Sequence, residues 1–344
     1  MPAVPSFRFR RALLFVTIVA GVLGVTGVTG CSSGDPAPRT DVPEPASAPP
    51  VTQRPAGTVV ALPGDPEGLA VDPNDKILAA GVRDPDGVAL ISTSTGREQK
   101  VIRLSGAPRH LELVRYGGTL LVPLEQTDQL VQLALPAGRV IARTRVGQQP
   151  HDAASGASAT IFVGNEHSNT VSIIQNGQVM ATEPAPLQPG GVAASPNGTV
   201  VVVVGVRGRR LEAFSESGQS LGTAPVGVGP THVVGATNAL FYVADTEGNA
   251  IDVVRIGSRP YQVATVPTKR GAPYGLALDR ARGRLYVTLT ASNELESFRI
   301  KGRTLVPDRT WPTVRQPNSV AVDSSTGRVF VASRTASELQ LVDP

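Results

Sequence analysis

From residue 57 to the end, short apolar stretches alternate with groups of turn-forming residues. The apolar stretches are rich in β-branched and aromatic residues, and Gly, Pro, Asn, Asp and Ser separate them. This alternation is typical of short strands joined by tight turns. Clear examples are residues 160–163, 240–243, 284–287 and 328–331, and a later strand of the same units reads 170–174, 250–254 and 338–342. The pattern predicts an all-β fold.

The strand pattern repeats with a nearly constant period. A proline with Gly or Gln one or two positions before it begins each unit, followed by a small-to-apolar run such as 68–72 or 275–279. The seven prolines are Pro66, Pro108, Pro150, Pro189, Pro230, Pro273 and Pro317, separated by 42, 42, 39, 41, 43 and 44 residues. A period near 40 with several strands per unit predicts a β-propeller with one blade per unit.

The seventh unit ends one strand early. Six units carry a glycine before a fourth, outer strand: Gly96, Gly138, Gly177, Gly218, Gly257 and Gly302. The last unit stops after residues 338–342, whereas the apolar segment 58–62 precedes the first unit without a blade of its own. An open ring would leave exposed strand edges. We therefore expect a seven-bladed propeller at 57–344, with four-stranded antiparallel blades and the N-terminal strand completing the last blade.

One unit carries a recognisable repeat. Residues 161–174, IFVGNEHSNTVSII, resemble the YVTN/NHL-type propeller repeat, and residues 241–245 and 285–288 match it more loosely. Residues 77–80 and the valine run 200–204 depart from it. The resemblance implies a mostly extracytoplasmic family whose relatives include adhesion modules, binding proteins, lactonase-like enzymes and electron-transfer dehydrogenase subunits. It implies no single activity.

The first residues read as an export signal. Arg8, Arg10 and Arg11 precede an apolar run, and the sequence VTGC ends at Cys31. A basic region, an apolar region and small residues before a cut site predict a secretory signal peptide at 1–30. Its end resembles the bacterial lipobox, which implies acylation of Cys31, for example with palmitate, and anchoring to the outer face of the cell membrane. An uncleaved transmembrane anchor is the alternative. The Pro-rich segment 31–56 is expected to be an extended tether.

Charge and cysteine content exclude several classes of function. The net charge is +4, and three of these charges lie in the expected signal, so 4 − 3 leaves about +1 for the rest. Such a weak excess does not favour nucleic acid as a partner. The single cysteine excludes internal disulfides and cysteine-based metal sites. No Walker loop, dinucleotide motif or Gly-x-Ser-x-Gly elbow lies in its required context.

The candidate site lies at the start of the inner strands, where a propeller opens around its channel. The two positions after each proline and the loops after the second strands should share this face. Three of the four histidines fall at these positions. The candidate ligand-binding residues are Glu67, Arg109, His110, His151, Asp152, His232, Tyr274, Asn318 and Arg334. The loops after the second strands form a second ring with Arg83, Glu125, Glu166, Arg207, Thr246, Thr290 and Arg334.

Two hypotheses follow for this face. In the first it is a polar surface whose residues bond one another, and the protein is a monomeric, non-catalytic binding module for a protein or a small cell-envelope ligand. In the second, His110, Asp152 and His232, with His151 or Glu67, hold a divalent metal ion in a lactonase-like hydrolase. The spread of blades two, three and five round the ring argues against a shared ion. No cofactor is predicted, and a redox subunit is a third, weaker hypothesis.

Overall fold

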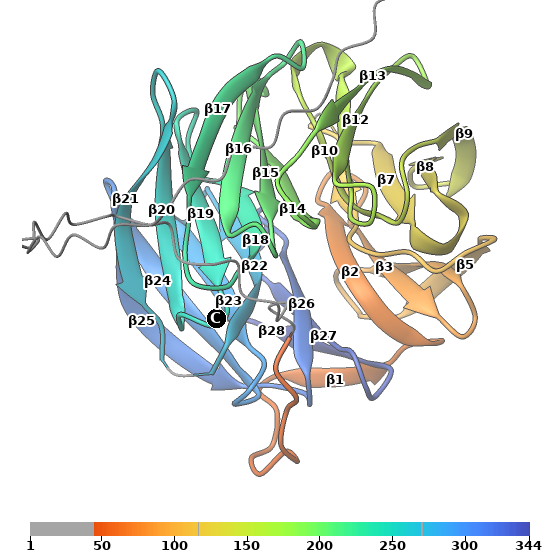
Figure 1. The fold of residues 1–344 in the computed structure, drawn as a ribbon. Coiled ribbons are helices and arrows are strands. Elements are labelled where there is room, and N and C mark those ends of the chain that lie inside the picture. Colours follow the sequence, from red (N-terminus) through yellow and green to blue (C-terminus); the bar gives the residue numbers. More distant parts are fainter. Residues whose placement is uncertain (1–44, 116, 270) are drawn as a thin grey trace, which may run out of the picture. The chain divides into compact units, whose positions relative to one another are not determined.

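The computed structural model describes residues 45–344 except 116 and 270. These residues form seven four-stranded antiparallel sheets, and their inner strands contact one another in sequence around a central channel (Figure 1). The expected seven-bladed propeller is therefore confirmed. The described part contains two short 3₁₀ helices, Glu125–Thr127 and Ala157–Ala159, and no helix of it is long and apolar enough to cross a membrane. The expected signal and Cys31 lie outside the described residues.

Six blades use four strands consecutive in the chain, the first lining the channel. Their bounds are, blade by blade, β2 (Asp65–Asp72), β3 (Ile77–Arg83), β4 (Gly87–Ser92), β5 (Glu98–Arg103); β6 (Glu112–Leu113), β7 (Thr119–Leu124), β8 (Gln129–Ala134), β9 (Arg139–Arg145); β10 (Pro150–Ser155), β11 (Ile161–Asn165), β12 (Thr170–Gln175), β13 (Gln178–Pro184); β14 (Pro189–Ala194), β15 (Val200–Gly205), β16 (Arg210–Ser215), β17 (Ser220–Pro225); β18 (Pro230–Gly235), β19 (Leu240–Asp245), β20 (Ala250–Ile256), β21 (Pro260–Pro267); β22 (Pro273–Asp279), β23 (Arg284–Leu289), β24 (Glu294–Lys301), β25 (Thr304–Pro312).

The seventh blade joins the two ends of the domain. Its inner strands are β26 (Pro317–Val322), β27 (Val329–Ser333) and β28 (Glu338–Val342), and β1 (Thr58–Ala61) completes it. Strand β1 pairs with β28 in the register Thr58↔Leu341 to Ala61↔Glu338. The side chains of Val60 and Leu62 pack into the core shared by blades seven and one. The N-terminal segment therefore closes the ring, as the strand count predicts.

The core lies between the blades. Second strands such as β15 and β19 are buried on both faces, because each blade is sandwiched by its neighbours. This double burial explains the unbroken valine run 200–204 that departs from the repeat. The largest fully buried side chains include those of Phe162, Tyr242 and Tyr286. Burying each such side chain stabilises the fold by about 2–3 kcal/mol.

Adjacent blades are also joined by a recurring polar bridge. The residue before the third strand adopts a left-handed conformation, with φ near +50° at Asp128, Asn169, Asn249 and Asn293. Asn and Asp tolerate this conformation better than other residues with a Cβ. In each case the side-chain oxygen accepts hydrogen bonds from backbone N–H groups just before the next blade's first proline, at 2.8–3.2 Å. This bridge gives a physical role to the asparagine of the repeat.

Part of the expected tether packs against the propeller. The side-chain amide of Gln316 accepts from the N–H of Ala48 at 2.7 Å and donates to the carbonyl of Ala46 at 2.7 Å. Asn293 donates to the carbonyl of Pro49 at 2.9 Å, and Ala48 is buried. These contacts lie at the junction of blades six and seven. They extend the packed part of the chain beyond the boundary expected at residue 57.

Candidate functional site

Each inner strand is irregular just after its proline, where the candidate residues lie. The register of β10 with β11 shifts between Pro150 and Asp152, and the corresponding strands of blades one, four, five, six and seven shift at the same point. In blade two the inner strand is reduced to β6, and Pro108 makes only an isolated bridge with Leu124. Such bulges redirect side chains. Here they turn the residues after the proline toward the channel mouth.

The ring is very narrow at this level. A Cβ added to Gly68 would lie 2.4 Å from the carbonyl oxygen of Arg109, and one added to Gly191 would lie 3.0 Å from Cα of His232. One added to Gly275 would lie 2.7 Å from the carbonyl oxygen of Asn318. Blades one, four and six therefore need glycine where blades two and five carry histidine. The small residues leave the space into which the imidazoles extend.

Ion pairs connect the mouth residues of blades one, two and seven. Buried Glu67 lies 2.9 Å from Arg83, 2.9 Å from Arg109 and 3.3 Å from Arg334. Arg83 also binds Glu125 at 3.0 Å. A buried carboxylate is tolerated when paired guanidinium groups offset its desolvation. The network holds Arg109 next to the imidazoles.

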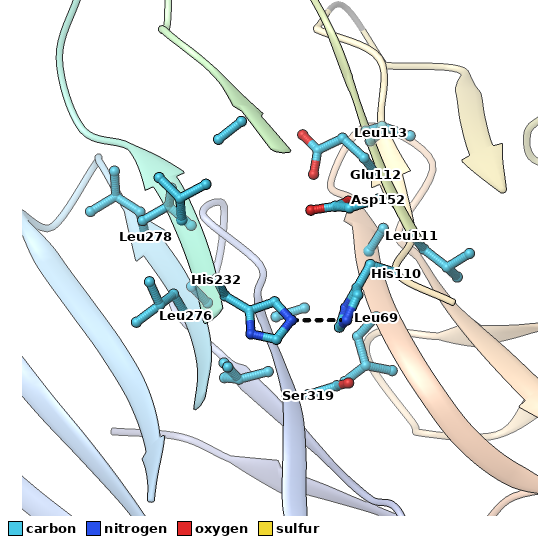
Figure 2. A pocket seen from close by; sticks show the side chains of 18 of the residues that line it. Leu69, His110, Leu111, Glu112, Leu113, Asp152, His232, Leu276, Leu278 and Ser319 are labelled. Carbon is cyan, nitrogen blue, oxygen red and sulfur yellow. Dashed lines mark hydrogen bonds between the residues drawn. The ribbon is translucent and has the colours of Figure 1, made fainter. Parts of the chain in front are cut away.

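Three imidazoles from three blades meet in the mouth. The Nε2 atoms of His110 and His232 are 2.9 Å apart, and the rings of His110 and His151 stack with centroids 4.9 Å apart. One ring nitrogen from each of the three histidines lies within 4.8 Å of the others. Figure 2 shows His110 and His232 pointing at each other from opposite walls of the channel. The separation of the blades therefore does not keep these side chains apart, contrary to the argument from the sequence.

The neighbouring carboxylate fixes the proton on His151. Nδ1 of His151 lies 2.8 Å from Oε2 of Glu166 and 3.3 Å from Nη2 of Arg109. Although burial opposes ionisation, hydrogen bonds from His151 and Gln188 and the charge of nearby Arg109 lower the pKa of Glu166 to about 2. An ionised Glu166 accepts the Nδ1 proton, which leaves Nε2 as the ring nitrogen of His151 that this carboxylate does not engage. That Nε2 atom is buried and has no hydrogen-bond partner among the described residues.

Burial lowers the pKa of the other two imidazoles. Burial is the main cause that lowers the pKa of His232 to about 3, followed by the charges of His151 and Arg109. Burial and then His232 and His151 lower the pKa of His110 well below its ordinary value. Neutral imidazole is the form that ligates metal ions. Together with His151 they present three adjacent ring nitrogens that could hold one transition-metal ion.

Several polar atoms at the mouth lack partners. Among the described residues, Nε of Arg83, Nε of Arg109, Nε2 of His151, Oε1 of Gln188 and Nδ1 of His232 are buried without a hydrogen bond. Buried polar atoms are rarely left unpaired without a reason such as a bound ligand, water or ion. Here five of them surround one opening. The mouth therefore has bonding capacity that the protein itself does not use.

The remaining candidates line the same opening. The Tyr274 ring packs edge-on against His232 at a centroid distance of 4.3 Å. Asn318 lines the channel and accepts a hydrogen bond from Gln316 at 3.3 Å. Gln316 is the residue that also binds the segment 46–49. The N-terminal segment thus reaches the rim of the mouth.

Asp152 lies apart from the three imidazoles. Its carboxylate accepts hydrogen bonds at 2.8 Å from the N–H groups of Val192 and Ala153. Figure 2 shows it beside Glu112, further along the channel. The set of candidate metal ligands in the structure is therefore His110, His151 and His232, with His151 in the place expected for Asp152. Glu67, the other ligand considered, is engaged by three arginines.

The channel interior contains acids that the sequence analysis did not single out as a group. A cavity of about 300 Å³ runs along the inner strands, and the residues that line it include Glu112, Asp152 and Arg280. Burial and then Asp152 raise the pKa of Glu112 to about 8, and burial raises the pKa of Asp152 to about 6. Arg280 donates to the carbonyl of Gly235. The other six blades have Ala or Val where blade two has Glu112, and this exception is visible in the repeat.

Comparisons with known proteins identify the fold. No protein-family model and no curated protein matches the sequence. Among solved structures, the chain is similar to Kuenenia stuttgartiensis hydrazine synthase, with a TM-score of 0.71, 14% identity and coverage of 83% of this chain and 97% of the other. It is similar to virginiamycin B lyase from Staphylococcus aureus, with a TM-score of 0.68, 12% identity and coverage of 83% of this chain and 98% of the other. It is also similar to a chain of the mitotic checkpoint complex, with a TM-score of 0.72, 14% identity and coverage of 91% of this chain and 99% of the other. At these identities the likeness shows the propeller fold alone.

Proposed function

We propose that the protein is a lipid-anchored, extracytoplasmic binding module that takes a small polar ligand, or a side chain of a partner protein, at the channel mouth. The observation that supports this most strongly is the set of five buried polar atoms around that opening that make no hydrogen bond. They include both donors and acceptors, which suits a ligand with mixed hydrogen-bonding groups. The ion pairs of Glu67 hold the guanidinium groups in position before a ligand arrives.

The proposed location is based on the N-terminal sequence. Cys31 after an apolar run and a basic region supports export and acylation, with the protein acting as a monomer on the outer face of the membrane. Replacing Cys31→Ser should abolish incorporation of labelled palmitate and release the protein from washed membranes. Labelling that persists in the variant would refute the anchor.

Binding at the mouth can be tested by thermal shift on the full-length protein in detergent. The probes are succinate, inorganic phosphate, N-acetylglucosamine and the dipeptide D-alanyl-D-alanine, which present carboxylate, phosphate, sugar and peptide groups. At least one should raise the melting temperature of the wild type and of Arg207→Ala, a control that removes an exposed cation from the equivalent loop of blade four. The same probe should not stabilise Arg109→Gln. A shift retained in Arg109→Gln, or no shift with any probe, counts against the mouth as the binding site.

A second candidate is a lactonase-like hydrolase at the same mouth. It is favoured by the three adjacent imidazoles, one of them oriented by an ionised carboxylate. The structural relatives include an enzyme, virginiamycin B lyase, although their likeness extends to the fold only. Hydrolysis of a panel of γ- and δ-lactones, lost in His151→Ala and retained in His167→Ala, would support it. Absence of turnover, with probe binding intact, would favour the binding module.

A further inference from the structure

Three features of the mouth converge on one point between blades two, three and five. His110 and His232 approach each other from opposite walls, and His151 stacks on His110. The 2.9 Å separation of the two Nε2 atoms is that of an N–H···N hydrogen bond, with one Nε2 as donor and the other as acceptor. A metal ion bound at this point would take the place of that shared proton. The unpartnered Nε2 of His151 and Nδ1 of His232 show that the hydrogen bonds of the protein do not satisfy the cluster.

The spacing of the nitrogens is near that of a metal-bound set. Two nitrogens bound at 2.0–2.1 Å to one tetrahedral zinc ion lie about 3.4 Å apart. The shortest separation here is 2.9 Å, and none exceeds 4.8 Å. Side-chain rotations that move the rings by about 1 Å would equalise the three separations, a range that ordinary rotamer adjustment covers.

One of the three imidazoles already has a carboxylate partner on its other ring nitrogen. The Nδ1 of His151 donates to Glu166, and Glu166 in turn accepts from Gln188 at 2.7 Å. A carboxylate on the far nitrogen is the usual partner of a metal-bound histidine, because it fixes the tautomer and the ring orientation. This arrangement leaves Nε2 of His151 directed to the cluster as a ligand.

We propose that His110, His151 and His232 bind one late first-row divalent ion, with Zn²⁺ as the best fit, and leave a fourth position open at the mouth. Three imidazole nitrogen ligands favour such an ion over Mg²⁺ or Ca²⁺, which prefer oxygen. Arg109 and Tyr274 flank this position, so an anionic oxygen of the ligand can occupy it. The inference rests on the mouth being the binding site proposed above, and it names metal coordination as the means of recognition.

The test titrates the full-length protein in detergent, after chelator treatment and dialysis, with ZnCl₂ by calorimetry and with CoCl₂ by visible spectroscopy. We expect one equivalent of Zn²⁺, no comparable binding of Mg²⁺, and a cobalt spectrum typical of a tetrahedral nitrogen-rich site. His110→Ala and His151→Ala should each weaken binding roughly 100-fold or more. His232→Phe should do the same while keeping a ring against Tyr274. His167→Ala removes the only other histidine, which is exposed, and should bind as the wild type does.

The role of Glu166 needs a separate pair of variants. Glu166→Gln should weaken Zn²⁺ binding about 10- to 100-fold with unchanged stoichiometry. Glu212→Gln, on strand β16 of blade four, whose carboxylate accepts from Ser220, should leave it unchanged. Failure of the wild type to bind one equivalent, or equal losses in His167→Ala and the mouth variants, would overturn the metal site. Because the organic probes are measured separately, a metal-free mouth that still binds one of them would leave the proposed function standing.

Discussion

The blade junctions and the channel mouth use polar residues in opposite ways. At the junctions, Asn169, Asn249 and Asn293 each place an oxygen on a backbone N–H of the next blade. At the mouth, Arg109, His151 and His232 keep buried atoms without a hydrogen bond. The two regions occupy different positions of the same repeat: the junction residues directly precede the third strand, and the mouth residues follow the first proline. Completed bonds mark residues that hold the ring together, and unused bonds mark residues available to a ligand.

The largest loss of stability is expected at the junction where β1 closes the ring. Deleting residues 58–62 removes the ladder between β1 and β28 and the buried side chain of Leu62. We expect the free energy of unfolding to fall by about 4 kcal/mol or more. Deleting residues 46–50, a segment of equal length, removes a few hydrogen bonds and should cost only about 1–2 kcal/mol.

Urea unfolding followed by circular dichroism measures both deletions in the full-length protein. Equal losses of stability would show that the closing strand contributes no more than the segment packed beside it. In that case β1 would complete the topology of the seventh blade without being a main source of its stability.

A bridging asparagine tests the junctions on a smaller scale. The Oδ1 atom of Asn249 accepts from the N–H groups of Gly271 and Ala272, and the residue has a φ of +52°. Asn249→Ala should destabilise the protein by about 2–4 kcal/mol, because it leaves buried donors unpaired and strains the backbone. Asn249→Gly relieves the strain and should cost about 1 kcal/mol less. Neither should change Zn²⁺ affinity, whereas a junction variant that weakens metal binding would break the distinction between the two regions.

The ring could be predicted from the sequence because its signals are local. Turn glycines, strand composition and the period of the prolines each act within one blade, and five of the six outer-turn glycines adopt positive φ, as at Gly96 and Gly177. The strand count then requires segment 58–62 in blade seven. These features depend on short-range geometry that residue types specify directly.

The arrangement inside the mouth depends on distances across the ring, which the sequence does not specify. The candidate histidines were identifiable by their place after the prolines, but their convergence depends on how closely neighbouring backbones approach at Gly191 and Gly275. The N–H of His110 also bonds the carbonyl of His151, a link between blades made possible by the shortened strand β6. The packing of residues 46–49 depends on the amide of Gln316, which no apolar pattern reveals.

Two neighbouring aspartates of blade five, Asp245 and Asp252, differ in how completely their carboxylates are hydrogen-bonded. Among the proposed substitutions and deletions, those at these two residues have the smallest expected effect on stability. Asp245 accepts backbone N–H groups from Val228, Gly229 and Gly248. Asp252 is fully buried, and while its Oδ1 accepts from the side chains of Gln262 and Thr265, its Oδ2 has no hydrogen-bond partner. By the same reasoning as at the mouth, the ionised carboxylate of Asp252 should destabilise the folded protein.

The pH dependence of stability gives the sign of that cost. Burial raises the pKa of Asp252 from 3.8 to about 6, with the nearby charge of Asp245 adding to the shift. Because the folded-state pKa is above the unfolded one, ionisation is harder in the folded protein, and stability falls as the pH rises from about 4 to about 6. Asp252→Asn should therefore stabilise the protein by about 1–2 kcal/mol at pH 7.5 and have little effect at pH 4.

Asp245→Asn should destabilise the protein at pH 7.5, since one amide oxygen cannot accept all three N–H groups. Urea titrations at the two pH values measure both, and a destabilising Asp252→Asn at pH 7.5 would show that an unpartnered buried oxygen does not by itself mark a residue as unneeded by the fold.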